Sequence, residues 1–240
     1  MTDRTAISSS HSRPRHDSSG ASSEAVEDYA KAMYALEERA GGDAVSTSAL
    51  AERLGVSAGS VTAMLKRMAE QGLVAHKPYR GARLTSKGRR VALEVIRHHR
   101  LLESYLTEVL GMPWDQVHSE AEILEHYISE DLEERIAVAL GHPRRDPHGD
   151  PIPTRELSLE TESAIPLSQL EAGEGAIVTR VSDSDPAMLR HLAECGIRPG
   201  AAVRMGERAP FGGSLSVCAG GDEQLIGPEL ADRVLVRSER

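Results

Sequence analysis

The sequence predicts a mainly α-helical protein in which a winged helix-turn-helix is followed by a helical dimerisation domain and a small SH3-like β-barrel. Three observations predict this. Apolar residues recur at helical spacing from Val26 to about residue 140. A glycine turn and a basic hairpin interrupt this pattern between residues 55 and 84. Short β-rich runs separated by glycine and polar turns fill the last 70 residues or so.

Composition divides the chain into five segments. Residues 1–23 are rich in serine and almost free of apolar residues, which is typical of a disordered tail. We place the winged helix-turn-helix at residues 24–92 and the helical domain at residues 93–141. A proline-rich, helix-breaking linker follows at residues 142–164, and the SH3-like domain takes residues 165–240.

Several features indicate a cytoplasmic protein with no membrane partner. No segment has the roughly 20 apolar residues of a membrane span, and the first 24 residues lack the apolar run of a signal peptide. The two cysteines, Cys195 and Cys218, lack the close spacing of a redox pair or zinc knuckle. We expect both to be small buried residues in a reducing compartment.

The helix-turn-helix is predicted by the stretch VSTSALAERLGVSAGSVTAMLKRMAEQGLV. Gly55 supplies the turn, and Ser57 is a favourable N-cap for a second helix that ends near Gln71. The next stretch, LVAHKPYRGARLTSKGRR, has β-forming residues on both sides of Tyr79-Arg80-Gly81 and predicts a wing with a basic tip. Two helices joined by a tight turn and followed by a hairpin are typical of a winged helix-turn-helix DNA-binding module.

Charge is segregated along the chain, although the formal net charge of -9 alone argues against nucleic acid. Residues 71–93 contain no acidic side chain, whereas residues 103–134 contain no lysine or arginine. We therefore expect an anion at one region and a cation at another. The alternative is a winged helix used only for protein contacts. The predicted contacts with double-stranded DNA are Ser57, Gly59, Ser60, Thr62, Lys66, Lys77, Arg80 and Arg83.

Histidine and glutamate recur at i,i+4 spacing in the acidic region, which suggests a metal site. The pairs are His99 with Glu103, His118 with Glu122, and Glu122 with His126, and Glu125 is adjacent. Each pair projects from one helical face. A solvated acidic face is the alternative explanation. No cysteine is near these residues, which excludes a thiolate site and favours oxygen-rich sites for harder ions.

Several ordered motifs resemble the diphtheria toxin repressor family of metal-dependent regulators, and most closely its manganese-sensing branch with a C-terminal SH3-like, FeoA-type domain. They are EDYAKAMYALEE, VSAGSVTAMLKRMAEQGLV, RHHRLLESYL, VHSEAEILEHYIS and DPHGDPIP, and the resemblance covers about residues 24–238. It implies a homodimer that binds a palindromic operator when metal fixes the N-terminal helix. Without metal, the acidic pocket would repel itself and leave that helix loose.

The resemblance also implies two ligand sets. A main site would use Asp28, Glu122, Glu125 and His126, and a second site would use His99, Glu103 and His118. Iron-sensing members have cysteine and methionine where this chain has Glu122 and Asp28, which points to Mn2+. Fe2+ stays open as the effector, and Co2+ or Zn2+ can substitute.

Two departures from the family pattern concern the metal sites. Lys31 stands where the short manganese regulators have glutamate, and a charged lysine cannot coordinate a metal. The third domain can lend a ligand to the second site, and Asp185 is the candidate. We interpret His142 and His148 in the linker as exposed loop residues rather than ligands.

Three other functional classes compete with a metal-dependent repressor of metal-uptake genes. A metalloenzyme could use the carboxylate–histidine pairs, but the sequence has no HExxH motif or nucleophile elbow, and we expect no enzyme activity. A winged-helix regulator could instead sense an organic ligand without metal. An adaptor could bind proline-rich peptides through the SH3-like domain.

Overall fold

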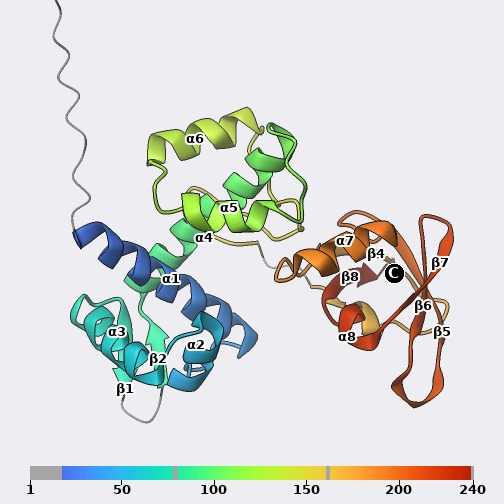
Figure 1. The fold of residues 1–240 in the computed structure, drawn as a ribbon, viewed down its shortest axis with the longest axis horizontal. Coiled ribbons are helices and arrows are strands. Elements are labelled where there is room, and N and C mark those ends of the chain that lie inside the picture. Colours follow the sequence, from blue (N-terminus) through green and yellow to red (C-terminus); the bar gives the residue numbers. More distant parts are fainter. Residues whose placement is uncertain (1–17, 78–80, 161–162, 239–240) are drawn as a thin grey trace, which may run out of the picture.

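The computed structural model describes residues 18–77, 81–160 and 163–238 (Figure 1). A helical part and a β-rich part lie side by side along the longest axis of the molecule (Figure 1). None of the helices in these ranges is long and apolar enough to cross a membrane. The N-terminal elements are α1 (Ser18–Arg39), α2 (Thr47–Leu54), α3 (Ala58–Glu70), β1 (Val74–Lys77) and β2 (Gly81–Leu84).

Helix α1 is longer than the sequence predicts, because residues 18–23, expected in the disordered tail, form its first turns. Tail residues 1–17 lie outside the described ranges. The helix ends at Arg39, and Gly41 and Gly42 follow with φ values of 62° and 88° that favour glycine. Its buried face, which includes Val26, Tyr29 and Met33, belongs to the core of the N-terminal module.

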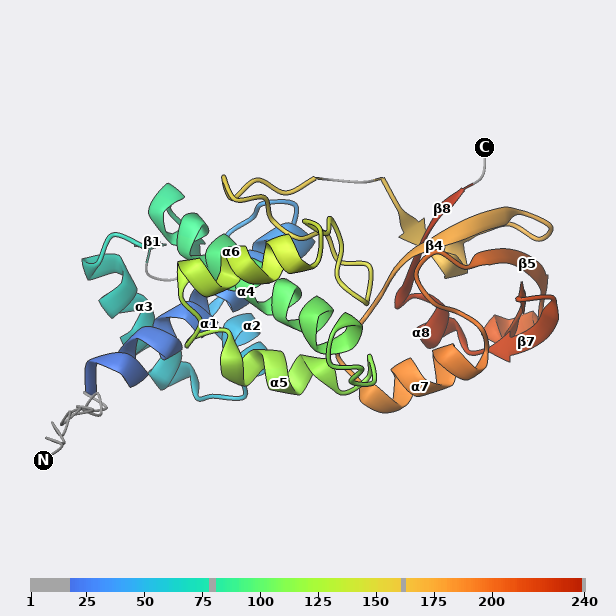
Figure 2. The ribbon, with the colours of Figure 1, turned by 90° about the horizontal axis from the view of Figure 1, so that it is seen from above.

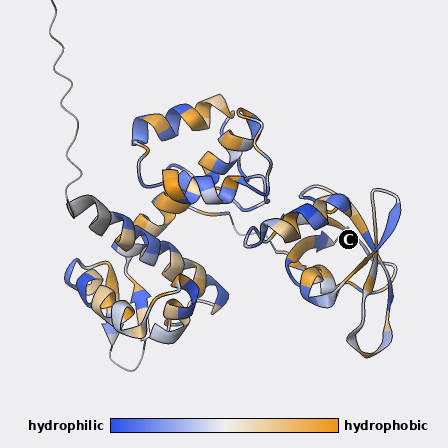
Figure 3. Ribbon diagram, in the orientation of Figure 1, coloured by the Kyte–Doolittle hydropathy of each residue, from blue (hydrophilic) through white to orange (hydrophobic). Residues whose placement is uncertain are grey.

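Local capping confirms the predicted helix-turn-helix. The Ser57 hydroxyl accepts a hydrogen bond from the Ser60 amide at 3.1 Å at the start of α3, as predicted. Gly55, in the left-handed region, closes α2 and makes the turn. Figure 3 shows that the helices carry both hydrophobic and hydrophilic residues, as amphipathic helices do. The apolar face of α3 consists of Val61, Leu65 and Met68, all buried.

Helix α4 (Ser86–Glu108) connects the wing to the second helical domain. Thr85 caps it by accepting a hydrogen bond from the Gly88 amide. Both α5 (Val117–Leu124) and α6 (Glu130–Ala139) lie against α4 in the second domain, and α1 contacts the same helix (Figure 2). Helix α4 therefore joins the N-terminal module to the acidic region.

The strands of the third domain are β3 (Ile165–Pro166), β4 (Gly175–Val181), β5 (Ala202–Arg208), β6 (Leu215–Ala219), β7 (Asp222–Ile226) and β8 (Val234–Ser238). They form one antiparallel sheet in the order β3-β8-β4-β5-β6-β7. The closed barrel expected from the sequence is therefore wrong. Strand β3 pairs with β8 through two residues only, and β7 pairs with β6 alone among the described strands, so the sheet keeps two edges. The helices between the strands are the 3-10 helices η1 (Leu167–Gln169) and η2 (Pro210–Gly212) and the α-helices α7 (Pro186–Glu194) and α8 (Pro228–Ala231).

The segment expected to be an exposed linker folds against the helical domain at residues 144–153. His148 is fully buried, which corrects its interpretation as an exposed loop residue, whereas His142 is exposed. The Asp146 carboxylate accepts hydrogen bonds from the amides of His148 and Asp150, which folds the segment into a compact turn. The Asp146 carboxylate thus satisfies two backbone amides of the linker inside the protein.

The two cysteines lie in different surroundings. Cys195 is buried in the core of the third domain, as expected. Cys218 is exposed, contrary to the expectation, because its side chain lies on the outward face of β6. Both thiols are free.

Candidate metal centre and DNA-binding surface

Three elements bring seven of the eight predicted metal ligands together. Helix α1 carries Asp28, α4 carries His99 and Glu103, and α5 with the turn after it carries the remaining four, His118, Glu122, Glu125 and His126. The i,i+4 spacing places His99 Nε2 3.0 Å from a Glu103 oxygen and His118 Nε2 3.7 Å from a Glu122 oxygen. The side chains form two neighbouring clusters.

The first cluster joins α1 to the turn after α5. His126 Nε2 lies 3.1 Å from Asp28 Oδ1 and 3.7 Å from Glu125 Oε1. Glu125 is buried, and Asp28 is partly exposed. The other ring nitrogen, His126 Nδ1, lies 2.6 Å from Glu27 Oε2. Histidine ligands commonly donate their second N–H to a carboxylate, so Glu27 orients the imidazole with Nε2 toward the cluster.

Carboxylates make the first cluster strongly attractive to positive charge. The pKa of His126 is raised to about 10, mainly by its hydrogen bond to Asp28 and, second, by its hydrogen bond to Glu27. The hydrogen bond to His126 in turn lowers the pKa of Glu27. The sequence reasoning missed Glu27, although its position next to Asp28 on α1 was a signal for a supporting carboxylate.

The second cluster joins α4 and α5 to the third domain. His99 Nε2 and His118 Nδ1 are 3.1 Å apart, and each lies within 3.2 Å of Glu103 Oε1. Asp183, from the loop between β4 and α7, places Oδ2 3.2 Å from His118 Nδ1. The pKa of His118 is raised to about 10, mainly by its hydrogen bond to Asp183 and, second, by its hydrogen bond to Glu103. Burial opposes ionisation of Asp183, but His118 lowers its pKa to about 2.

The structure brings Asp183 rather than Asp185 to the second cluster. The Asp185 carboxylate accepts hydrogen bonds from the amides of Ala187 and Met188 and caps helix α7. The carboxylate therefore has a local role at the helix terminus. Both aspartates lie in the sequence VSDSDP, and only the path of the loop distinguishes them.

Glu122 lies between the clusters and contacts Lys31 rather than Asp28. Its Oε1 atom is 2.7 Å from Lys31 Nζ and 3.9 Å from His99 Nδ1. Burial opposes ionisation of Glu122, but Lys31 outweighs it and lowers the pKa of this carboxyl. Glu122 was predicted in one set with Asp28 and His126, whereas here it groups with His99 and Glu125.

The donors in both clusters are carboxylate oxygens and imidazole nitrogens. This set fits a divalent transition ion of the Mn2+, Fe2+ or Zn2+ type. In this structure the positive charge beside these carboxylates comes from Lys31 and from histidines whose pKa is raised. The residues present therefore fit the ion that the sequence predicts.

The predicted DNA-binding face of α3 is exposed. Ser57, Gly59, Ser60, Thr62 and Lys66 all lie on the surface, opposite the buried face of the helix. Two of these hydroxyls also make local hydrogen bonds: the Ser57 hydroxyl accepts from the Ser60 amide, and the Thr62 hydroxyl donates to the Ala58 carbonyl. Apart from Lys66, the predicted contact residues on this face of α3 therefore have short side chains or none.

The wing places part of the predicted basic surface beside α3. Strands β1 and β2 are antiparallel, with Val74 opposite Leu84 at one end and Lys77 opposite Gly81 at the other. Arg83 is exposed and lies 3.2 Å from Asp43. The predicted contact Arg80 and the side chain of Lys77 lie outside the described part of the structure. For these two residues the DNA contact stays a prediction.

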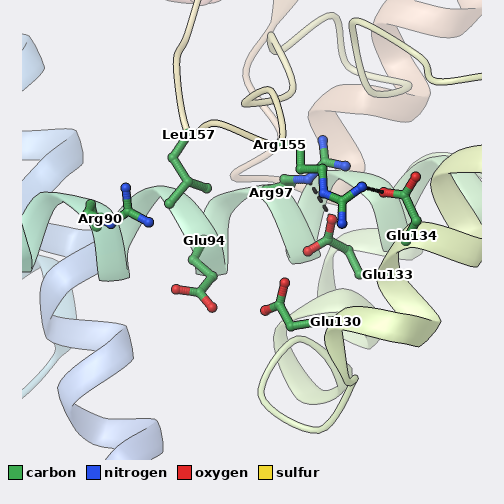
Figure 4. A pocket seen from close by; sticks show the side chains of 8 residues that line it. All are labelled: Arg90, Glu94, Arg97, Glu130, Glu133, Glu134, Arg155 and Leu157. Atoms are coloured by element: carbon green, nitrogen blue, oxygen red, sulfur yellow. Dashed lines mark hydrogen bonds and ion pairs between the residues drawn. The ribbon is translucent and has the colours of Figure 1, made fainter.

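A separate pocket of about 130 Å³ lies on the side of α4 that faces α6, and no residue of the two clusters lines it (Figure 4). Arg97 Nε donates to Glu133 Oε1 at 2.6 Å, and Arg155 pairs with Glu134 at 3.8 Å. These arginines neutralise the carboxylates beside them. The pocket is lined by Arg90, Glu94, Arg97, Glu130, Glu133, Glu134, Arg155 and Leu157.

Three family models match successive parts of the chain. The first is the N-terminal DNA binding domain of the iron dependent repressor, at residues 22–82. The second is the metal binding and dimerisation domain of the same family, at residues 85–154, and the third is the FeoA domain, at residues 165–238. The chain belongs to the iron-dependent repressor family. The ligand clusters lie mainly in the region that the second model matches.

Curated relatives of this repressor-family chain include the iron-dependent repressor IdeR of Mycobacterium tuberculosis. The two are 35% identical over 184 residues, which cover 72% of this chain and 80% of the relative. The diphtheria toxin repressor of Corynebacterium efficiens is 35% identical over 147 residues, which cover 57% and 64%.

Solved structures extend the likeness to all three domains. A manganese-dependent transcriptional repressor in complex with manganese shares 42% identity at a TM-score of 0.81, covering 89% of this chain and 99% of that one. The structure of the manganese regulator SloR gives 29% identity and a TM-score of 0.72, with coverage of 89% and 98%. The family fold therefore includes the third domain.

Proposed function

We propose that this member of the iron-dependent repressor family is a cytoplasmic, Mn2+-activated transcriptional repressor. As a homodimer it binds an operator in double-stranded DNA and controls genes of metal uptake. The observation that carries the proposal is the convergence of Asp28, from the DNA-binding module, with Glu125 and His126 from the second domain. One ion bound there joins the two modules.

Helix α1 has two faces with different tasks. Its apolar face, with Tyr29 and Met33, packs in the core of the helix-turn-helix. Its acidic face presents Asp28 to the first cluster. A bound ion supplies positive charge that holds Asp28 against Glu125 and His126. Because α1 is part of the core around α3, fixing α1 also fixes α3 in the orientation that fits the operator.

Manganese is favoured over iron by the ligand chemistry. The first cluster offers oxygen from Asp28 and Glu125 and a single imidazole nitrogen, a hard set that suits Mn2+. Fe2+ is the second candidate, because carboxylate and imidazole donors also accept it. Similar proteins carry both names, manganese-dependent and iron-dependent. Co2+ and Zn2+ can occupy the same donors.

The competing classes are less well supported. Membership of a repressor family and an exposed α3 face speak against a hydrolase. A regulator that ignores metal would leave the buried acidic clusters without a function. An adaptor in which the linker's own proline-rich segment docks on the SH3-like domain would need that segment free, but residues 144–153 pack on α4 through Arg100, which donates to the Pro151 carbonyl and to Asp150.

The test is fluorescence anisotropy with the chelator-treated full chain and a labelled upstream region from its own genome. Mn2+, Fe2+ and Zn2+ are titrated separately at fixed salt. Saturable binding that requires Mn2+, at lower concentration than Fe2+, and that chelator reverses supports the proposal. Binding that is indifferent to every metal would favour the metal-independent regulator.

A further inference from the structure

Lys31 extends from α1 into the centre of the metal-ligand residues. Its ammonium nitrogen lies 2.7 Å from Glu122 Oε1 and 2.9 and 2.8 Å from the two oxygens of Glu125. It also lies 3.1 Å from His99 Nδ1. The Lys31 side chain is 18% exposed and that of Glu125 is 0% exposed. An ammonium group thus contacts the most buried carboxylate of the first cluster.

The contacts of Lys31 involve the same atoms that a metal ion requires. Glu125 Oε1 belongs to the group with Asp28 and His126, and Glu125 and Glu122 also group with His99. Lys31 donates to both Glu125 oxygens, so its charge lies beside the atoms that would bind an ion. A transition ion bound to a carboxylate oxygen at roughly 2.1 Å would lie close to the ammonium, and the two positive charges would repel.

We propose that Lys31 is a built-in competitor of the metal, whose ammonium occupies the Glu122–Glu125 pair and must leave when a divalent ion binds. Lys31 thereby raises the metal concentration at which the repressor responds. This inference rests on the proposed function and deepens it. The exchange replaces one protein cation with one metal ion on the same carboxylates, without any covalent step.

The ion pair also links α1 to α5 through the protein's own charges. Asp28 and Lys31 lie three residues apart on α1 and both face the turn after α5. Lys31 tethers α1 through Glu122 and Glu125, whereas a metal ion would tether it through Asp28. The acidic pocket is therefore partly neutralised by Lys31, and α1 is not held by Asp28 alone.

The experiment is calorimetric titration of Mn2+ alone into the chelator-treated full chain, as wild type and as Lys31→Met, which keeps the length of the stem but removes the charge. We expect Lys31→Met to bind Mn2+ on the order of tenfold more tightly, as follows from losing a competitor held by charged hydrogen bonds. Lys31→Arg keeps a competing cation and should stay near wild type. The matched control is Lys87→Met, on α4 outside both clusters, which should leave the affinity unchanged.

Thermal unfolding gives an independent readout. With chelator, Lys31→Met should melt below wild type because Glu122 and Glu125 lose their partner, whereas saturating Mn2+ should remove or reverse this difference. Unchanged or weaker Mn2+ binding by Lys31→Met, while the wild type binds Mn2+ normally, would overturn the inference but leave the proposed function intact. A wild type that binds no divalent ion would overturn both. If Lys31→Met fails to fold, comparing Lys31→Gln with Lys31→Arg gives the same test.

Discussion

The buried carboxylate of Glu103 faces three histidines. Its Oε1 atom faces His99 and His118, whereas Oε2 lies 3.5 Å from Nδ1 of His148. Burial opposes ionisation of Glu103, but His99 and the hydrogen bonds from its histidine neighbours hold its pKa well below the usual range. His148 is itself fixed, because Nε2 donates to the Trp114 carbonyl at 2.8 Å. The buried turn around His148 therefore helps to orient a predicted metal ligand.

The first prediction compares two aspartates of the third domain. We expect Asp183→Asn to weaken Mn2+ binding at the second cluster roughly tenfold, because a carboxylate beside His118 becomes a neutral amide. Asp185→Asn is the control, since asparagine caps a helix as well as aspartate does. Calorimetry of both variants checks this. Weakened binding in Asp185→Asn, with Asp183→Asn unaffected, would return the role to Asp185.

At the scale of elements, the wing is tied to the segment between α1 and α2. The amide and carbonyl of Val45 pair with those of Ala82 at 2.8 and 2.9 Å. Gly81 makes this approach possible, because it has a φ of 81° and a Cβ added there would lie 2.6 Å from the Val45 carbonyl oxygen. The wing can therefore lie this close to Val45 only because Gly81 has no Cβ atom.

The second prediction concerns this glycine. Gly81→Ala should lower the free energy of unfolding by roughly 2 kcal/mol or more, from left-handed strain together with displacement of Val45. Gly42→Ala is the matched control: its φ is 88°, but nothing lies within 4 Å of the added Cβ. It should therefore show the strain of about 1 kcal/mol alone. Urea unfolding measures both, and equal losses would contradict the proposed clash.

At the scale of the whole molecule, α5 and α6 expose apolar side chains on the outside of the second domain. Ile123, Tyr127 and Val138 are 61%, 59% and 58% exposed. Exposed apolar surface of this kind commonly marks a protein interface. The family model that covers these helices describes a dimerisation domain. We expect a second copy of the chain to cover this face, which would give one DNA-binding module for each half of a palindrome.

The third prediction tests this dimer. Val138→Glu should shift the protein toward monomer, because a charge buried in the interface without a partner is costly. Leu225→Glu is the control, since Leu225 is 72% exposed but lies in the third domain. Light scattering coupled to size-exclusion chromatography gives the mass of each variant. A Val138→Glu protein that keeps the mass of the wild type would show that α6 is outside the interface.

The sequence predicted those parts of the fold that depend on local signals. Helical periodicity and the cap Ser57 located α3, and i,i+4 spacing identified the pairs His99–Glu103 and His118–Glu122. It failed where contacts between distant segments decide the outcome. The burial of His148, the choice of Asp183 over Asp185 and the open sheet all depend on how the third domain and the linker pack.

The most direct test of the account is the effect of Mn2+ on operator affinity in the wild type and in Asp28→Ala, measured by anisotropy at one salt concentration. Asp28 is the proposed ligand through which α1 would hold the metal, and its Oδ1 atom lies 3.1 Å from His126 Nε2. We predict that Mn2+ tightens wild-type binding on the order of tenfold or more, a usual size for allosteric coupling, and that Asp28→Ala loses this stimulation while circular dichroism shows its fold unchanged. Equal stimulation of both proteins would contradict the claim that metal acts by fixing α1.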